Sequence, residues 1–185
     1  MRPIVNVDPS GATTVKAEIS APLPELSQRT DTSPITGVAY DPNTGCHNAS
    51  TDMVKATGAE PKGPNGAVST STKTQTIKAA LYMAWQLIKG HGILVRVDKK
   101  DSTGTHLDRH ALAIRAVGVD KKGVYFKAVD PGTANKDMAG TVEKDEKMNI
   151  VTFRMTDGRL VGERNYGSHK TYIINQYREN IEKKK

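Results

Sequence analysis

The strongest constraint on the fold of this chain is a change of hydrophobic periodicity at Gly92. Before Gly92, apolar side chains recur at helical spacing, whereas short β-prone runs separated by Gly, Asp and Lys turns follow it. These runs are ILVRV (93–97), HALAIRAV (110–117), VYFKAV (124–129), NIVTFR (149–154), RLVGE (159–163) and KTYII (170–174). Helices that come first and strands that follow predict an α+β domain, with N-terminal helices packed on an antiparallel β-sheet.

Two helices are expected before the strands. The first opens at or just before Cys46, where Asn43 or Thr44 can cap it, and Gly58 can end it. The second is marked by Ile77, Leu81, Trp85 and Ile88 and stops at Gly90, and it carries an apolar stripe of Leu81, Met83 and Trp85. We expect this stripe to pack into the core rather than to form a cofactor site.

The length of 185 residues suits one domain with a substantial core. Residues 1–38 are rich in Pro, Ser, Thr and Ala without sustained periodicity, which predicts an extended or partly ordered N-terminal arm. The globular domain is expected over residues 39–180, followed by a basic tail over 181–185.

The net charge of +7 suits an anionic partner such as an acidic protein or the bacterial cell wall. Nucleic acid is not expected, because no interleaving of aromatic and basic residues accompanies the charge. No apolar run approaches the roughly 18 residues of a membrane span, and the first residues lack the apolar run of a secretory signal. We therefore expect a cytoplasmic protein unless a specialised system delivers it.

The most informative stretch is HALAIRAVGVDKKGVYFKAVDPG, residues 110–132. Two β-prone runs flank the turn GVDKKG, and a hairpin symmetric about Asp120 sets His110 opposite Asp130. The same register builds an apolar face from three pairs, namely Leu112 with Ala128, Ile114 with Phe126 and Ala116 with Val124. Directly opposed residues have Cβ atoms about 4.5–5.5 Å apart, so the carboxylate of Asp130 can accept a hydrogen bond from the imidazole of His110.

Cys46 acquires a chemical role from this pair. A thiol at a helix N-terminus lies at the positive end of the helix dipole, and a nearby imidazolium lowers its pKa further. An aspartate behind the histidine fixes the orientation and tautomer of the ring. The sequence therefore predicts a catalytic triad of Cys46 as nucleophile, His110 as base and Asp130 as the orienting carboxylate.

Each of these residues also has an ordinary structural interpretation. Cys46 alone is better explained as a buried core cysteine, His110 as a strand residue and Asp130 as a turn residue before Pro131. His47 is a rival base, although neighbouring side chains on a helix point about 100° apart. A metal site built from Cys46 and His47 has no ligand spacing behind it, and no phosphate loop is present, so no metal and no cofactor is expected.

The segments GCHNASTDMVKATG (45–58) and HALAIRAVGVDKKGVYFKAVDPG (110–132) resemble the nucleophile helix and the His and Asp strands of papain-like cysteine peptidases, in the branch of the bacteriocin-leader (C39-like) peptidases. The resemblance implies a papain-like fold with residues 39–180 as the catalytic domain. This branch usually has Gly-Pro after the cysteine, where this chain has His47 and Asn48. It also usually has a Gln before the cysteine, where this chain reads GVAYDPNTG, which leaves Asn43 and the backbone N–H of Cys46 as oxyanion candidates.

A triad of this kind implies thiolate attack on an amide carbonyl, an acyl-enzyme and release by water. The amide can be a peptide bond, a peptidoglycan cross-link, or a glutamine or asparagine side chain. Small papain-like domains without a signal sequence also resemble effectors and toxins that bacteria deliver by specialised secretion, type VI included. Some of these cleave peptidoglycan, and some deamidate host Rho-family GTPases.

We therefore expect a delivered bacterial effector that deamidates a protein target such as a Rho-family GTPase. A cysteine peptidase or peptidoglycan amidase is the alternative, and a catalytically inactive papain-like binding module is a third interpretation. The expected partners are the protein or peptidoglycan substrate, together with an immunity or delivery protein.

Overall fold

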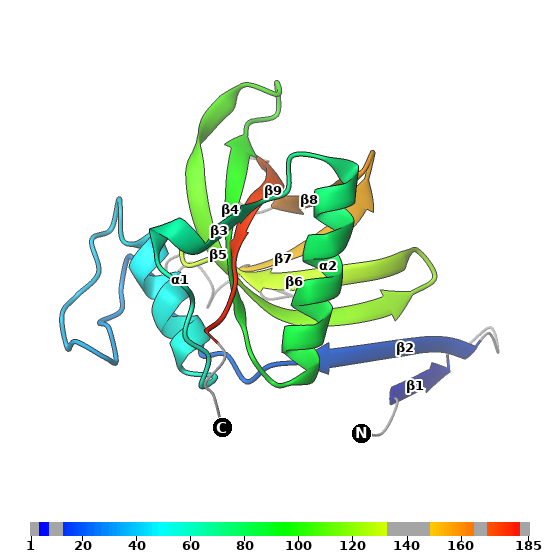
Figure 1. The fold of residues 1–185 in the computed structure, drawn as a ribbon, viewed down its shortest axis with the longest axis horizontal. Coiled ribbons are helices and arrows are strands. Elements are labelled where there is room, and N and C mark those ends of the chain that lie inside the picture. The colour runs from blue at the N-terminus through cyan, green and yellow to red at the C-terminus, as the bar shows by residue number, and fades with distance from the viewer. Residues whose placement is uncertain (1–3, 8–12, 133–148, 165–169, 182–185) are drawn as a thin grey trace.

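The computed structural model describes residues 4–7, 13–132, 149–164 and 170–181. Its helices are α1 (Cys46–Lys55) and α2 (Lys73–Ile88), with a short 3-10 helix η1 (Pro64–Gly66) between them. Its strands are β1 (Ile4–Val7), β2 (Thr13–Ser20), β3 (Ala67–Ser69), β4 (Ile93–Lys100), β5 (His106–Asp120), β6 (Gly123–Val129), β7 (Ile150–Thr156), β8 (Arg159–Arg164) and β9 (Lys170–Arg178). Figure 1 shows the two helices set apart from each other against a body of curved strands.

The six strands β4 to β9 close into an antiparallel barrel. The order around the ring is β5, β4, β9, β8, β7 and β6, and the pairing of β6 with β5 closes it. Outside the ring, β2 pairs with β5, β1 pairs with β2, and β3 pairs with β9. The expected papain-like α+β fold, with N-terminal helices packed on a sheet, is therefore wrong: the described chain is mostly β, with two short helices.

Closure depends on the length of β5. This 15-residue strand pairs with β4 along its first part and with β6 along its second part, so it joins the two ends of the ring. A barrel closes when the first and last strands of the sheet pair with each other, which depends on the number and register of all the strands. The alternation of apolar residues within one strand does not indicate whether this pairing occurs. For this reason the sequence predicts the strands and their antiparallel sense but not the barrel.

The β5–β6 hairpin does not have the symmetric register that was expected. Asp120 pairs with Gly123, so the turn contains two residues instead of being centred on Asp120. Val124 lies opposite Val119 and is 55% exposed, which removes it from the predicted apolar face. The other predicted members of that face that lie on β6, Phe126 and Ala128, are buried.

A β-bulge then changes the phase of β5. The register shifts between Ile114 and Ala116, and beyond the shift Ile114 pairs with Ala128. Side chains alternate between the faces of a strand, so the two-residue turn alone would set His110 and Asp130 on opposite faces. The extra residue in the bulge returns them to the same face. The two side chains therefore meet although they are not directly opposed.

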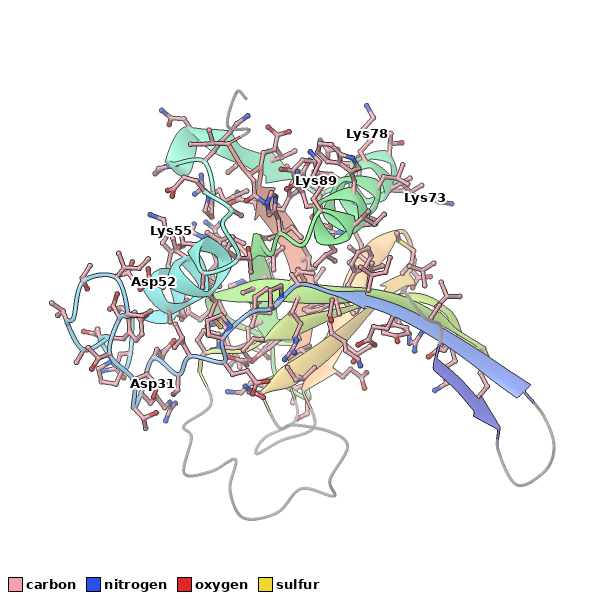
Figure 2. The ribbon with its side chains drawn as sticks, turned by 90° about the horizontal axis from the view of Figure 1, so that it is seen from below. Asp31, Asp52, Lys55, Lys73, Lys78 and Lys89 are labelled. Carbon is pink, nitrogen blue, oxygen red and sulfur yellow. The ribbon has the colours of Figure 1, made fainter. Side chains whose placement is uncertain are left out.

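Helix α2 packs on the barrel with a different face from the one predicted. Its buried residues are Thr76, Ala79, Met83, Gln86 and Leu87. Of the predicted stripe only Met83 is buried, whereas Leu81 is 67% and Trp85 43% exposed; the other two apolar residues that marked the helix, Ile77 and Ile88, are exposed as well. Lysines line this outward side, as Figure 2 shows for Lys73 and Lys78, and Lys89 Nζ lies 3.2 Å from the centroid of the Trp85 ring.

The segment before α1 is held against the barrel and against α1. Strand β2 pairs with β5, and the buried carboxylate of Asp52 on α1 accepts hydrogen bonds from Ser33 Oγ (2.6 Å) and Tyr40 Oη (2.7 Å). Figure 2 shows the loop of residues 21–45 beside α1, with Asp52 on the helix. Of the predicted arm, residues 1–3 and 8–12 lie outside the described residues, and so do residues 182–185 of the predicted tail.

The exposure of α2 gives a direct test of the fold. Met83→Ala should lower the free energy of unfolding by about 2–5 kcal/mol, because it leaves a cavity at a fully buried position. Leu81→Ala, on the same helix, should change it by no more than about 0.5 kcal/mol, since that side chain is exposed. Urea denaturation followed by circular dichroism measures both, and equal losses would mean that the helix packs with the predicted stripe inward.

Candidate active site

Cys46 is the first residue of α1, and the turn before it fixes its position. Asp41 Oδ1 accepts hydrogen bonds from the backbone N–H groups of Asn43 and Thr44, each at 2.8 Å. Gly45 is the N-cap residue, and a Cβ there would lie 2.5 Å from the carbonyl oxygen of Asp41, so the turn requires glycine. The predicted side-chain cap from Asn43 or Thr44 is wrong, because α1 has no side-chain cap.

The start of α1 is attached to the strand that carries the histidine. Ser50, about one turn further along the helix, is fully buried and donates from Oγ to the carbonyl oxygen of Ala111 at 3.1 Å. Ala111 follows His110 on β5. The imidazole of His110 and the backbone N–H of Ala111 lie close enough to the sulfur of Cys46 to lower its pKa. The structure thus brings two predicted site residues, Cys46 and His110, into contact.

His110 and Asp130 form a buried pair. His110 Nε2 lies 2.7 Å from Asp130 Oδ1, so the other ring nitrogen is the one left for the thiol. Burial alone would lower the pKa of His110, but the charge of Asp130 and its hydrogen bond, with smaller contributions from Cys46, raise that pKa to about 9. The imidazolium form of His110 is therefore stabilised at neutral pH.

Asp130 directly follows β6 and is 1% exposed. Besides His110, its Oδ1 accepts a hydrogen bond from the backbone N–H of Gly132 at 2.7 Å, and its Oδ2 accepts one from the hydroxyl of Tyr172 at 2.8 Å. A buried carboxylate needs such donors, because the cost of removing the charge from water is otherwise large. The donors also fix the carboxylate, and through it the orientation of the imidazole.

The thiol of Cys46 is half-buried, and burial by itself would raise its pKa. The hydrogen bond and charge of His110, followed by the backbone N–H groups of Ala111 and His47, outweigh burial and hold the pKa of Cys46 below its ordinary value of 9.0. A lowered thiol pKa beside a raised imidazole pKa favours a thiolate–imidazolium pair. This arrangement can supply a nucleophile and a proton donor at adjacent positions.

The other candidates from the sequence are placed differently. Asn43 is exposed, and no hydrogen bond in the described part of the chain joins its side chain to Cys46, His110 or Asp130. His47 does not bond the sulfur through its ring: its Nδ1 is buried and has no partner among the described residues. Its pKa is lowered by burial and then by the positive charges of Arg96 and Arg178. The geometry gives the base position to His110 instead of His47.

Two residues beside the triad were not found from the sequence. Tyr172 lies on β9, far from the other site residues along the chain, and its ring centroid is 6.0 Å from that of His110. Only the closed barrel brings it there, so no local pattern could have indicated it. Gly132 was visible in the DPG sequence: a Cβ there would lie 3.0 Å from Asp130 Oδ1 and 3.3 Å from His110 Nε2, so a larger residue would press on the pair.

Comparisons of the chain with protein-family models, curated proteins and solved structures gave no match. Within the described residues, no group of three or more His, Cys, Asp and Glu side chains is placed to hold a metal ion. None of the helices described is long and apolar enough to cross a membrane.

The ionisation of Cys46 can be tested by alkylation with iodoacetamide across pH. The rate follows the thiolate fraction, so it should fall as pH falls through the pKa of Cys46, with a midpoint below that of a free cysteine measured alongside. His110→Gln should move that midpoint upward, because burial then acts without the imidazolium. His106→Gln, an exposed histidine on the same strand, should leave it unchanged. An unchanged midpoint in His110→Gln would contradict the pairing.

The hydrogen bond from Tyr172 can be tested by removing one hydroxyl. Tyr172→Phe should lower the free energy of unfolding by about 1–3 kcal/mol, because it takes a donor from the fully buried carboxylate of Asp130. Tyr125→Phe is the matched control: its hydroxyl donates to Glu18, whose carboxylate is partly exposed and also pairs with Lys127. Thermal and urea unfolding compare the two variants, and an equal or smaller effect for Tyr172→Phe would contradict this account of Asp130.

Proposed function

We propose that this protein is a cysteine-dependent amide hydrolase. The observation that supports the proposal most is the buried hydrogen bond between His110 and Asp130, with the thiol of Cys46 close enough to the imidazole for His110 to lower its pKa. The three residues come from α1, from β5 and from the turn after β6. The sequence resemblance to papain-like peptidases supports the chemistry of these three residues, but it does not extend to the fold.

In the proposed reaction, the thiolate of Cys46 attacks the carbonyl carbon of an amide. The imidazolium of His110 gives its proton to the leaving nitrogen, the C–N bond breaks, and an acyl-enzyme thioester remains on Cys46. His110, now neutral, takes a proton from water, which attacks the thioester and releases the carboxylic acid and the thiol. Backbone N–H groups in the first turn of a helix have no partner within the helix, and we assign that of Cys46 to the oxyanion.

We propose a glutamine or asparagine side chain of a protein as the substrate, and a delivered effector as the biological setting. A protease has to hold an extended segment of main chain beside the nucleophile. The thiol of Cys46 is half-buried at the start of α1, which suits a single side-chain amide better. The departures from the peptidase pattern at His47 and Asn48 favour the same choice.

The test is to mix the protein with purified candidate targets, a Rho-family GTPase among them, and with a lysate of target cells. Deamidation should release ammonia and raise the mass of the target by about 1 Da without fragments, because the main chain is left intact. Activity should increase as Cys46 ionises and decrease as pH rises past about 9, where His110 loses the proton that the leaving group requires.

Cys46→Ala and His110→Gln should abolish the ammonia release, and His106→Gln should retain it. New amino termini or released muropeptides without ammonia, lost in Cys46→Ala, would replace deamidation by peptidase or peptidoglycan amidase activity and keep the triad. If Cys46 is alkylated at the same rate as a free cysteine at every pH, the proposed hydrolase activity is contradicted, and an inactive binding module is favoured.

A further inference from the structure

A cluster of one histidine and two arginines lies near Cys46 and takes no part in the triad. Its members are His47, Arg96 and Arg178. His47 follows Cys46 on α1, Arg96 lies on β4, and Arg178 is the last residue of β9. The cluster is assembled from three elements that are distant in sequence, and the barrel brings them together.

The strand registers place the cluster under the start of α1. Ala111, whose N–H is near enough to the sulfur of Cys46 to lower its pKa, is the direct partner of Arg96 across β5 and β4. Arg96 is in turn the direct partner of Gln176 on β9, and Arg178 is two residues further along the same face. Opposed residues in neighbouring strands share a face, so this row runs across the sheet from the nucleophile to the two arginines.

The positive charges in this row have no counter-charge in the described part of the chain. Arg178 is only 7% exposed, and its hydrogen bond is to a neutral group, the carbonyl oxygen of Gly63. Neither a hydrogen bond nor an ion pair joins the guanidinium of Arg96 to any other described residue. Buried charges are normally paired, because an unpaired one costs a large desolvation energy. An arginine with five N–H donors and one neutral acceptor has donors available for an anion.

The ring of His47 completes the cluster. Its Nδ1 is buried and unpartnered among the described residues, which is an uncommon state for a buried polar atom. Burial, and then the charges of Arg96 and Arg178, lower the pKa of His47, which places all three groups in one electrostatic neighbourhood. Adjacent helical side chains diverge by about 100°, so an anion held at His47 would lie beside the thiolate instead of on it.

We propose that His47, Arg96 and Arg178 form an anion-binding subsite that receives a carboxylate of the substrate next to the amide attacked by Cys46. The inference rests on the proposed hydrolase, and it gives that enzyme a substrate class: an amide flanked by an acidic residue in a protein. Arginine binds carboxylates in a two-pronged geometry that adds orientation as well as affinity. The subsite would fix the reacting amide with respect to the sulfur.

Two alkylating reagents of the same size but different charge test this. In each, the sulfur of Cys46 displaces iodide from the CH₂ carbon, so an S–C bond forms as the C–I bond breaks. Iodoacetate carries a carboxylate, whereas iodoacetamide carries a neutral amide. The ratio of the iodoacetate rate to the iodoacetamide rate should be higher for Cys46 than for a small free thiol. Arg96→Gln should lower this ratio by about tenfold, as expected for the loss of one charge-assisted bond.

The controls separate the subsite from the triad and from overall charge. Lys121→Gln removes the same charge from the exposed turn at the far end of β5 and should leave the ratio unchanged. His47→Gln should lower it without moving the pH midpoint for iodoacetamide, whereas loss of His110 moves that midpoint. A reactive thiolate whose ratio is insensitive to Arg96→Gln, or equally sensitive to Lys121→Gln, would overturn the subsite and leave the hydrolase standing. A thiol without activation, whose ratio still responds to Arg96→Gln, would overturn the hydrolase and keep the anion site.

Discussion

The buried carboxylate of Asp130 is the group on which the arrangement of the site depends. A charge that is 1% exposed is tolerated only when its oxygens are hydrogen-bonded, and its donors come from β5, from β9 and from the turn that follows it. His110 and Tyr172 reach it from two strands that the barrel brings near the end of β6. The closed ring is therefore both the scaffold of the chain and the condition for a correctly oriented imidazole.

The sequence predicts the contact between His110 and Asp130, but the symmetric hairpin from which it was predicted is not the register that forms. Alternation of apolar residues located both strands, and the DKK turn located the hairpin, but the pattern did not contain the two-residue turn or the bulge between Ile114 and Ala116. The two-residue turn alone would put His110 and Asp130 on opposite faces of the hairpin, and the bulge returns them to the same face, as a symmetric hairpin would have done. A bulge is one extra residue in one strand, and the alternation of apolar residues in the sequence does not indicate where it occurs.

For the helices, the sequence pattern predicts the elements but not how they pack. The spacing of apolar residues correctly predicts that α1 and α2 are helices. It predicts the wrong buried face for α2, because the stripe of large apolar residues is not the side that packs on the barrel. The barrel receives the face with Ala79, Met83 and Leu87, where small side chains alternate with large ones. A helix with apolar residues on two faces has no unique orientation in its sequence, and only the shape of the surface beneath it decides between them.

The barrel shows that the fold and the reaction implied by the sequence resemblance have to be considered separately. A resemblance over residues 45–58 and 110–132 implied both a fold and a reaction, and the fold it implied is wrong. The proposed reaction survives this correction because its parts are local: a helix that begins at a cysteine, a strand that carries a histidine, and the next strand ending at an aspartate. Such a unit can be supported by any sheet that sets the helix start over the strand, since function resides in sites and not in folds. What the particular barrel adds is β9, which supplies Tyr172 to Asp130 and places Arg178 close enough to His47 to lower its pKa. The specificity proposed for this site therefore depends on the barrel, whereas its proposed chemistry does not.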